Sequence, residues 1–442
     1  MSKTLLEQAR EVVVKAQKLG AQGVRTSLGR SRNSEVEWRD GKLDRLREST
    51  SMSIGITLYV DGRYSSNSSS DLRPEAIDSF LKETVAMTRV LAKDQHRKLP
   101  DPGRFKDRFG GDLKIFDEKG SAAVTAVDRR KTASDLEAAA RSGPKADQII
   151  SVTSSCSDTV SENAKVTSNG MEGSRQSSTF VLFTETSVKD EGGRKPEGWH
   201  YAVTRHRGKL PGVETIGGEA TRRAFLDVGA KPEKSGQYTC VIENRVAGQL
   251  LGGLLSPLSG SAIQQKRSFL ADKLGQEVLG KILTITDDPF IVEGLGSRTY
   301  DEEGMSLKKM PVFEKGVLRT FYLDTYYASK LGMEPTTGGQ SNLVFSTGNK
   351  DLAGLLKVMG KGILVTGFSG GNSNSATGDF SIGIRGQWIE NGKIVRPVAE
   401  MNMAGNHLKF WKKLAELGGD PHPYSSWRTP SLRFGKIQFS GV

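Results

Sequence analysis

Between residues 246 and 265 the chain carries no ionisable side chain, although 26% of its residues are charged. An uncharged stretch of this length leaves two structures open, a membrane-spanning helix or an element buried in a protein core. Serine, glutamine, glycine and a proline interrupt the leucines here, and such residues disfavour a bilayer. We therefore expect a buried helix that ends in a turn. The N-terminus lacks the apolar run of a signal peptide, which favours a cytoplasmic protein.

The bulk composition narrows the class of protein. With 442 residues the chain is too long for one ordinary core, and two or three domains are expected. The net charge of +12 comes from basic residues interleaved with acidic ones. This interleaving argues for a solvated basic surface and against a nucleic-acid partner. Cys156 and Cys240 are far apart in sequence, which is typical of reduced, buried thiols in the cytoplasm.

The first third of the chain mixes helix and hairpin signals. Apolar residues recur at helical spacing over 5–19, and a second helix is expected over 74–92. Asp40-Gly41 and Asp61-Gly62 are typical of two-residue turns between paired strands. Proline and glycine over 99–111 indicate a linker.

The remainder of the chain continues this mixture. The spacing predicts helices over 121–141 and 262–278, strands over 148–160, 177–188 and 199–206, and a hairpin turn at Asn391-Gly392. Strands and helices alternate without regular βαβ units, so the fold class is α+β, with mixed sheets, packed helices and a strand-rich C-terminal domain. We expect an N-terminal region over 1–110, a middle region over 111–225 that packs with it, and a C-terminal domain over 226–442.

The histidines give no metal signal. They are His96, His200, His206, His407 and His422. None belongs to a His-Glu-x-x-His or His-Glu-x-x-x-His motif, and no cysteine pair compensates. His200 and His206 share a predicted strand and could face one side of it, but no carboxylate accompanies them.

One loop resembles a serine-hydrolase motif. Residues 367–371 read Gly-Phe-Ser-Gly-Gly, and Asp379 and His407 follow in the order that α/β-hydrolases use. A nucleophile elbow must lead into a helix, however, whereas residues 372–378 have turn chemistry. We expect a tight hairpin or a loop beside a ligand groove.

Many short segments together resemble one family. They include Gly55–Gly62, Ser69–Ile77, Leu250–Gly260, Ser268–Gly275, Asp301–Gly304, Thr377–Ser381, Trp388–Lys393 and Ala404–Asn406. In this order, over essentially the whole chain, they resemble the TldD/PmbA family, and most closely its PmbA/TldE branch.

The resemblance implies a cytoplasmic protein with the two-part TldD/PmbA architecture, related to zinc metallopeptidases. In the family, a TldD-type subunit carries His-Glu-x-x-x-His on a helix and a late cysteine ligand. It pairs with a TldE-type subunit, and the two process unfolded peptides. Family members have also been linked to modulation of DNA gyrase.

Carried onto this sequence, the motif loses its chemistry. Its two histidines fall at Leu251 and Ser256, its glutamate at Gly252, and the late cysteine near Thr429. Leucine and glycine offer no ligand, and neutral hydroxyls bind zinc poorly. The resemblance therefore implies a non-catalytic subunit without zinc, with zinc expected only in a TldD-type partner, and either a homodimer or a heterodimer with that partner.

A peptide groove or interface is expected around Gln249, Ser369, Asn372, Asp379 and Asn406. Two other functions stay open from the sequence: a stand-alone hydrolase centred on Ser369, and a binding protein associated with gyrase or nucleic acid.

Overall fold

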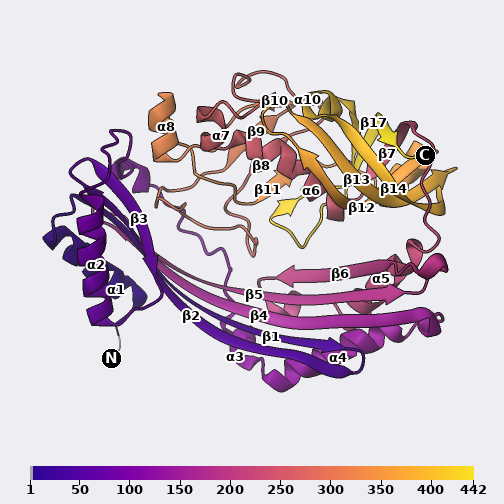
Figure 1. The fold of residues 1–442 in the computed structure, drawn as a ribbon, viewed down its shortest axis with the longest axis horizontal. Coiled ribbons are helices and arrows are strands. Elements are labelled where there is room, and N and C mark those ends of the chain that lie inside the picture. Colours follow the sequence, from indigo (N-terminus) through magenta and orange to yellow (C-terminus); the bar gives the residue numbers. More distant parts are fainter. Residues whose placement is uncertain (1–2) are drawn as a thin grey trace.

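A six-stranded antiparallel sheet of long, curved strands forms one side of the molecule in the computed structural model, which describes residues 3–442 (Figure 1). Its strands lie in the order β3-β2-β1-β4-β5-β6. They are β1 (Gly23–Arg39), β2 (Lys42–Val60), β3 (Arg63–Ser69), β4 (Ile149–Thr167), β5 (Glu172–Val188) and β6 (Glu197–Thr204). The first and middle parts of the sequence thus share one sheet, three strands from each.

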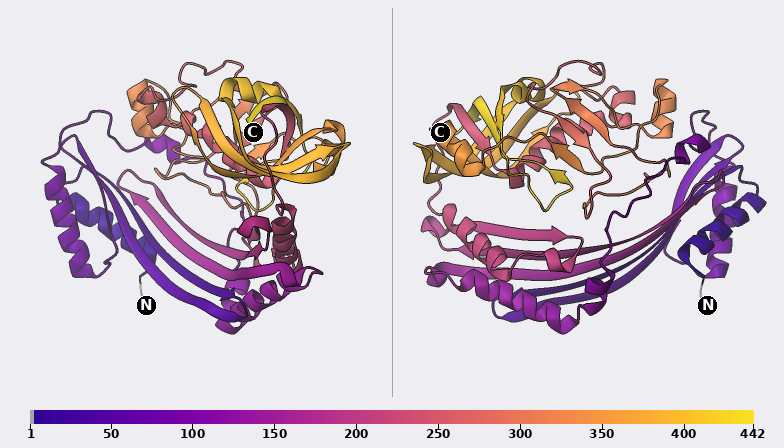
Figure 2. Two further views of the ribbon diagram at one scale, coloured as in Figure 1. Left: turned by 45° about the vertical axis from the view of Figure 1, so that its right-hand side comes forward. Right: turned by 180° about the vertical axis from the view of Figure 1, so that it is seen from behind.

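Helices cover the convex face of this sheet at its two ends (Figures 1 and 2). Helices α1 (Leu5–Lys18) and α2 (Pro74–Thr88) cover one end, and α4 (Ala126–Arg141) and α5 (Val213–Leu226) cover the other. The short α3 (Glu118–Ala123) lies between them. Successive side chains of a strand point to opposite faces. In β1 and β2, Leu28 and Ile56 therefore pack against the helices, whereas their neighbours Ser27 and Gly55 face the other way.

The C-terminal part is built around a small barrel. Its sheet has the order β14-β13-β12-β7-β17-β15, and a further β14–β17 pairing closes five of these strands into a ring. The strands are β7 (Gly236–Ile242), β12 (Gly362–Ser373), β13 (Asp379–Glu390), β14 (Lys393–Asn406), β15 (Leu414–Leu417) and β17 (Leu432–Ser440).

A five-stranded sheet and short helices accompany the barrel. The strands are β8 (Ile285–Asp287), β9 (Met310–Glu314), β10 (Val317–Leu318), β11 (Leu343–Phe345) and β16 (Trp427–Arg428). The helices are α6 (Asn244–Leu255), α7 (Gly260–Gln264), α8 (Thr325–Leu331), α9 (Leu352–Met359) and α10 (His407–Phe410). This C-terminal part lies across the concave face of the long sheet (Figure 2). There the buried Lys165 of β4 reaches the Glu302 carboxylate, at 3.0 Å.

The hairpin turns agree with the sequence. Both residues of Asp40-Gly41, Asp61-Gly62 and Asn391-Gly392 have positive φ, between 47° and 81°. This backbone conformation matches the right-handed twist of paired strands, and Asp-Gly and Asn-Gly adopt it at little cost. Helices α1 and α2 also agree, as does the buried helix α6, which a turn at Pro257 follows. Over residues 3–442 no helix is both long and apolar enough to span a bilayer.

Three expected elements differ. The helix over 262–278 is wrong, because α7 ends at Gln264 and Lys266 takes a positive φ of 55°. Phe269, Leu270 and Val278, which follow, are buried from irregular turns instead, whereas Leu274 is exposed. The helix over 121–141 begins earlier and breaks at Thr125, which caps α4. Strand β6 ends at Thr204, so His206 lies beyond it and does not share a strand with His200.

Strand β2 extends beyond its outer neighbour. It pairs with β1 along its whole length, but with β3 only from Ile54 to Val60. Residues 42–53 are therefore unpaired on one edge, and each of them is exposed. Such an edge presents backbone N–H and C=O groups to solvent.

Candidate functional site

Helix α6 presents two different faces. Leu250, Leu251, Leu254 and Leu255 are each at most 1% exposed and belong to the core of the barrel. The opposite stripe holds Arg245, Gly248, Gln249, Gly252, Gly253 and Ser256, none of which is buried. This stripe faces the long sheet, because Arg245 at its start reaches across to the main chain of β6. Each fully buried leucine contributes about 1.5–3 kcal/mol, which explains why α6 is stable although Arg245 is its one charged residue.

The positions expected for the metal ligands do not form one cluster. Leu251 is fully buried in the core, whereas Ser256 is exposed on the far side of the helix. Thr429 is buried too, and its hydroxyl donates to the carbonyl of Asn244 in the first turn of α6, at 2.9 Å. Gly252 lies on the open stripe, and a β-carbon there would have no atom within 4 Å.

The three glycines of the stripe differ in their surroundings. A β-carbon on Gly248 or Gly252 would meet nothing within 4 Å. On Gly253 it would lie 2.4 Å from Nε2 of His407 and 2.8 Å from Oγ of Ser373, which is closer than real contacts allow. Gly253 is thus required by the packing of α6 on the barrel, whereas the packing of this chain requires neither of the other two.

Alanine substitutions separate these cases. Gly248→Ala is expected to stabilise the protein by up to about 1 kcal/mol, because alanine is the better helix former and space is available. Gly253→Ala is expected to destabilise it by about 1–3 kcal/mol, since the buried His407 must move. Chemical denaturation of the two variants measures both effects, and the same sign for both would contradict this account of the helix.

His407 and Ser373 form a hydrogen-bonded pair that cannot act as a nucleophile and base. Nε2 of His407 lies 2.9 Å from the Ser373 hydroxyl, and the indole N–H of Trp411 donates to Nδ1 at 3.3 Å. Because Nδ1 accepts that bond, the proton of the neutral ring is on Nε2, which therefore donates to serine and has no lone pair for its proton. Burial lowers the pKa of His407 to about 4, so the ring stays neutral.

The Ser369 motif does not assemble into a triad. Residues 367–371 lie within β12, with bulges against β13, and not at a strand-to-helix turn. Ser369 is exposed, and the Asp379 carboxylate accepts a bond from Asn406 at 2.9 Å, not from His407. The structure therefore gives no support to a hydrolase built on Ser369.

The expected groove residues come together only in part. Asp379 and Asn406 pair across β13 and β14, and Asn372 lies nearby on β12, opposite Ser381. Gln249 is exposed on α6. Among residues 3–442, no hydrogen bond joins Gln249 to the other four.

His422 and the two cysteines have structural surroundings. His422 is buried beside the Tyr201 hydroxyl, and burial lowers its pKa to about 4. Burial raises the pKa of Cys156 to about 11 and of Cys240 to about 12, so neither thiol is reactive at neutral pH. Within the described part of the chain, no three His, Cys, Asp or Glu side chains are grouped to hold a metal ion.

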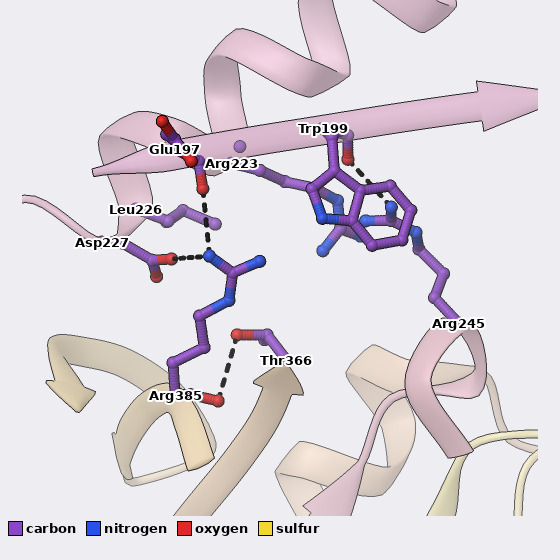
Figure 3. A pocket seen from close by; sticks show the side chains of 9 residues that line it. Glu197, Trp199, Arg223, Leu226, Asp227, Arg245, Thr366 and Arg385 are labelled. Atoms are coloured by element: carbon purple, nitrogen blue, oxygen red, sulfur yellow. Dashed lines mark hydrogen bonds and ion pairs between the residues drawn. The ribbon is translucent and has the colours of Figure 1, made fainter. Parts of the chain in front are cut away.

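A small pocket marks the junction between the long sheet and the barrel (Figure 3). Arg385 of β13 donates to the Glu197 carbonyl at 3.1 Å and lies 3.7 Å from the Asp227 carboxylate. Arg245 donates to the Trp199 carbonyl at 2.9 Å, and its guanidinium lies over the Trp199 ring. Burial raises the pKa of Asp227 to about 6. These contacts fix α6 relative to β6.

The concave face of the long sheet carries hydroxyl and amide side chains where β1 meets β4. The Ser31 and Ser161 hydroxyls are 3.1 Å apart, Thr159 donates to Asn33 at 3.0 Å, and Asn163 donates to Ser27 at 3.2 Å. Sequence analysis missed this surface. The sequence feature that indicates this surface is the alternation of serine, threonine and asparagine along β1 and β4. These side chains can be recognised as a ladder of cross-strand pairs only when the register of the two strands is known.

The structure is that of a two-part α+β protein. A long curved sheet forms one part and a small barrel forms the other, and the open stripe of α6 faces the space between them. Family models of this architecture match the chain in three segments: PmbA/TldA metallopeptidase domain 1 over residues 26–88, the central domain over 119–226, and the C-terminal domain over 235–441. The chain belongs to the PmbA/TldD family, which confirms the family expected from the sequence.

Individual relatives agree. The chain is 27% identical over 441 residues to the metalloprotease PmbA of Escherichia coli O157:H7, covering 99% of this chain and 96% of that protein. It is 40% identical to a candidate modulator of DNA gyrase from Bacteroides thetaiotaomicron VPI-5482, with a TM-score of 0.95 over 99% of this chain and 98% of the other. The TldE structure from Thermococcus kodakarensis has the same fold, with 20% identity, a TM-score of 0.86, and coverage of 98% and 100%.

Proposed function

We propose that this chain is a TldE-like, non-catalytic subunit that binds unfolded peptide and completes a peptidase together with a zinc-bearing TldD-type partner. The observation that carries the proposal is the donor chemistry of the open stripe of α6. Glycines, one glutamine, one arginine and one serine occupy it, and none of these is a good zinc ligand or a general base.

The burial of the residues of α6 favours aligning the His-Glu-x-x-x-His motif with other positions than Leu251, Gly252 and Ser256. In a helical His-Glu-x-x-x-His motif, the two histidines and the glutamate must all reach the metal and its water. Leu251 points into the core, so we infer that the corresponding residues are Gly248, Gln249 and Gly253, which have the same spacing on the open stripe. The side chains of these three residues do not fit zinc either, since glycine has no ligand and the glutamine amide is a poor one.

The surfaces that face the interior suit a peptide main chain. The hydroxyl and amide ladder of β1 and β4 offers donors and acceptors without a shape that selects one side chain. Gly248 and Gly252 allow a second backbone to approach α6 closely, although each glycine costs a helix up to about 1 kcal/mol. The retention of both glycines supports a surface that another chain contacts.

Reconstitution tests the proposal. Peptidase activity on an unfolded peptide is expected only when the chain is mixed with a TldD-type protein, and metal analysis of the chain alone should find less than stoichiometric zinc. Chelator-sensitive cleavage of the peptide by the chain alone would contradict the proposal that it is non-catalytic.

A matched pair of variants locates the surface. Gly252 and Gly218 are both helical glycines at which an added β-carbon would have no atom within 4 Å, but Gly218 lies exposed on α5. Gly252→Gln is expected to reduce the activity of the mixture at least tenfold, and Gly218→Gln to leave it unchanged, with similar thermal stability for both. Equal activities would show that α6 does not contribute to the shared site.

A further inference from the structure

A cavity of about 300 Å³ is lined by residues of β1, β2 and β3, of α8 and of loops of the C-terminal part. Figure 1 shows α8 above the end of the long sheet that carries β3. It lies at the end of the long sheet that α1 and α2 cover, and it does not include any residue of α6. Charged and tyrosine side chains dominate its wall: Arg25, Tyr59, Tyr64, Arg97, Lys98, Arg298, Asp301, Glu302, Glu303, Asp324 and Tyr326. Thr337, Gly338 and Gly339 complete it.

Arg97 is the best-positioned cation of this cavity. Its guanidinium lies 4.2 Å from the centre of the Tyr64 ring and 3.3 Å from that of Tyr326. Stacking on two rings fixes the plane of the group and leaves its N–H edges free. Throughout residues 3–442, no carboxylate lies within ion-pair distance of Arg97, and its side chain makes no hydrogen bond.

The acidic residues around the cavity already have partners within the chain, and they differ in how many. Glu303 pairs with Arg25 at 3.4 Å, and Glu302 pairs with the buried Lys165. Asp301 is buried, accepts two backbone N–H bonds on one oxygen, and has a second oxygen without a partner among the described residues. Within the same part of the chain, Arg97, Lys98 and Arg298 have no carboxylate in ion-pair distance, and of these Arg298 donates to the Gly339 and Gln340 carbonyls.

We propose that this cavity binds an amino acid or a short peptide through its free α-carboxylate, held by the stacked guanidinium of Arg97 with Lys98 beside it. A planar carboxylate matches the two parallel N–H groups of arginine. Asp324 and Glu303 add negative charge to the same wall, which complements the α-ammonium end of such a ligand. A phosphate fits less well, because the wall carries as many acidic as basic side chains, four of each, which suits a zwitterion better than a dianion.

Calorimetric titration of the isolated full-length chain tests this site without any partner, so its outcome does not depend on the proposed function. The probes are trialanine, N-acetyl-trialanine, trialanine amide and inorganic phosphate. Trialanine is expected to bind most tightly and N-acetyl-trialanine more weakly, whereas amidation should weaken binding at least tenfold, about 1.4 kcal/mol.

Variants of two stacked arginines provide the control. Arg130 of α4 lies outside the cavity, and its guanidinium is 5.5 Å from the centre of the Trp38 ring of β1. Arg97→Gln is expected to weaken trialanine binding at least tenfold, and Arg97→Lys several-fold because the forked geometry is lost. Arg130→Gln should leave binding unchanged, and circular dichroism confirms that each variant is folded.

Three results would overturn the proposal. They are no heat of binding for trialanine at concentrations up to about 10 mM, equal affinity for trialanine and its amide, and phosphate binding at least as tight as trialanine. If Arg97→Gln does not fold, the comparison between trialanine and its amide on the unaltered chain still decides the question.

Discussion

Replacing Asp158 with alanine is expected to lower the free energy of unfolding by about 3–5 kcal/mol. Asp158 of β4 receives two hydrogen bonds from the guanidinium of Arg129 on α4, and the two side chains are only 3% and 4% exposed. Without the carboxylate, Arg129 is a buried cation whose remaining ion-pair partner among residues 3–442 is the exposed Glu48, at 3.9 Å. Chemical denaturation measures the loss.

Two comparison variants distinguish the buried pair from an ordinary surface pair. Lys131 and Asp135 form an ion pair on the same helix, with side chains 74% and 42% exposed. Lys131→Ala is expected to cost less than about 0.5 kcal/mol. The double variant Arg129→Met with Asp158→Leu should recover most of the stability, because it removes both charges together. A cost below about 1 kcal/mol for Asp158→Ala would contradict the role of this pair in joining α4 to the sheet.

The buried histidines are expected to make the protein sensitive to acid. Burial lowers the pKa of His407 and of His422 from 6.5 to about 4. Because the folded state binds the proton less tightly than the unfolded state, this stabilisation is complete above pH 6.5 and is lost as the pH falls to 4. Each ring accounts for up to about 3 kcal/mol over that interval.

His407→Phe isolates the contribution of one ring. Phenylalanine keeps the aromatic packing between Phe269 and Phe380 but does not titrate. The loss of unfolding free energy between pH 6.5 and 4 is expected to be about 3 kcal/mol smaller in this variant. The comparison is needed because burial raises the pKa of Asp227 and Asp301 to about 6, and these carboxyls act in the opposite direction. An unchanged pH dependence would show that His407 protonates in the folded state.

The sequence was most informative where local chemistry determines the backbone. Asp40-Gly41 and Asn391-Gly392 specify their turns because both residues tolerate positive φ, and the leucines of α6 specify a buried helix because their spacing repeats on one face. The prediction for 262–278 was wrong because apolar residues there are helically spaced, whereas tertiary packing buries Phe269, Leu270 and Val278 from turns.

The site depended on information that spacing does not contain. The packing of α6 on the barrel decides which of its residues are buried and which lie on the open stripe. The sequence alone therefore did not show that Leu251 is buried in the core. The Ser373–His407 pair and the Arg97 cavity each bring together residues that are distant in sequence, so no local motif predicts either of them. The family resemblance implied the architecture, whereas the expectation that the motif positions lack zinc ligands came from the residue type at each of them.

The unpaired edge of β2 has a consequence for motion within the sheet. Residues 42–53 have a neighbouring strand on one side only, and their side chains are exposed on both faces. Opening this segment therefore breaks one set of backbone bonds and uncovers little apolar surface, so its local free energy of opening is far below that of the paired strands beside it. The outer part of β2 can separate from β1 and close again, while the hairpin turn stays attached through Asp40 and Gly41, which bond to Arg141, Ser151 and Glu137.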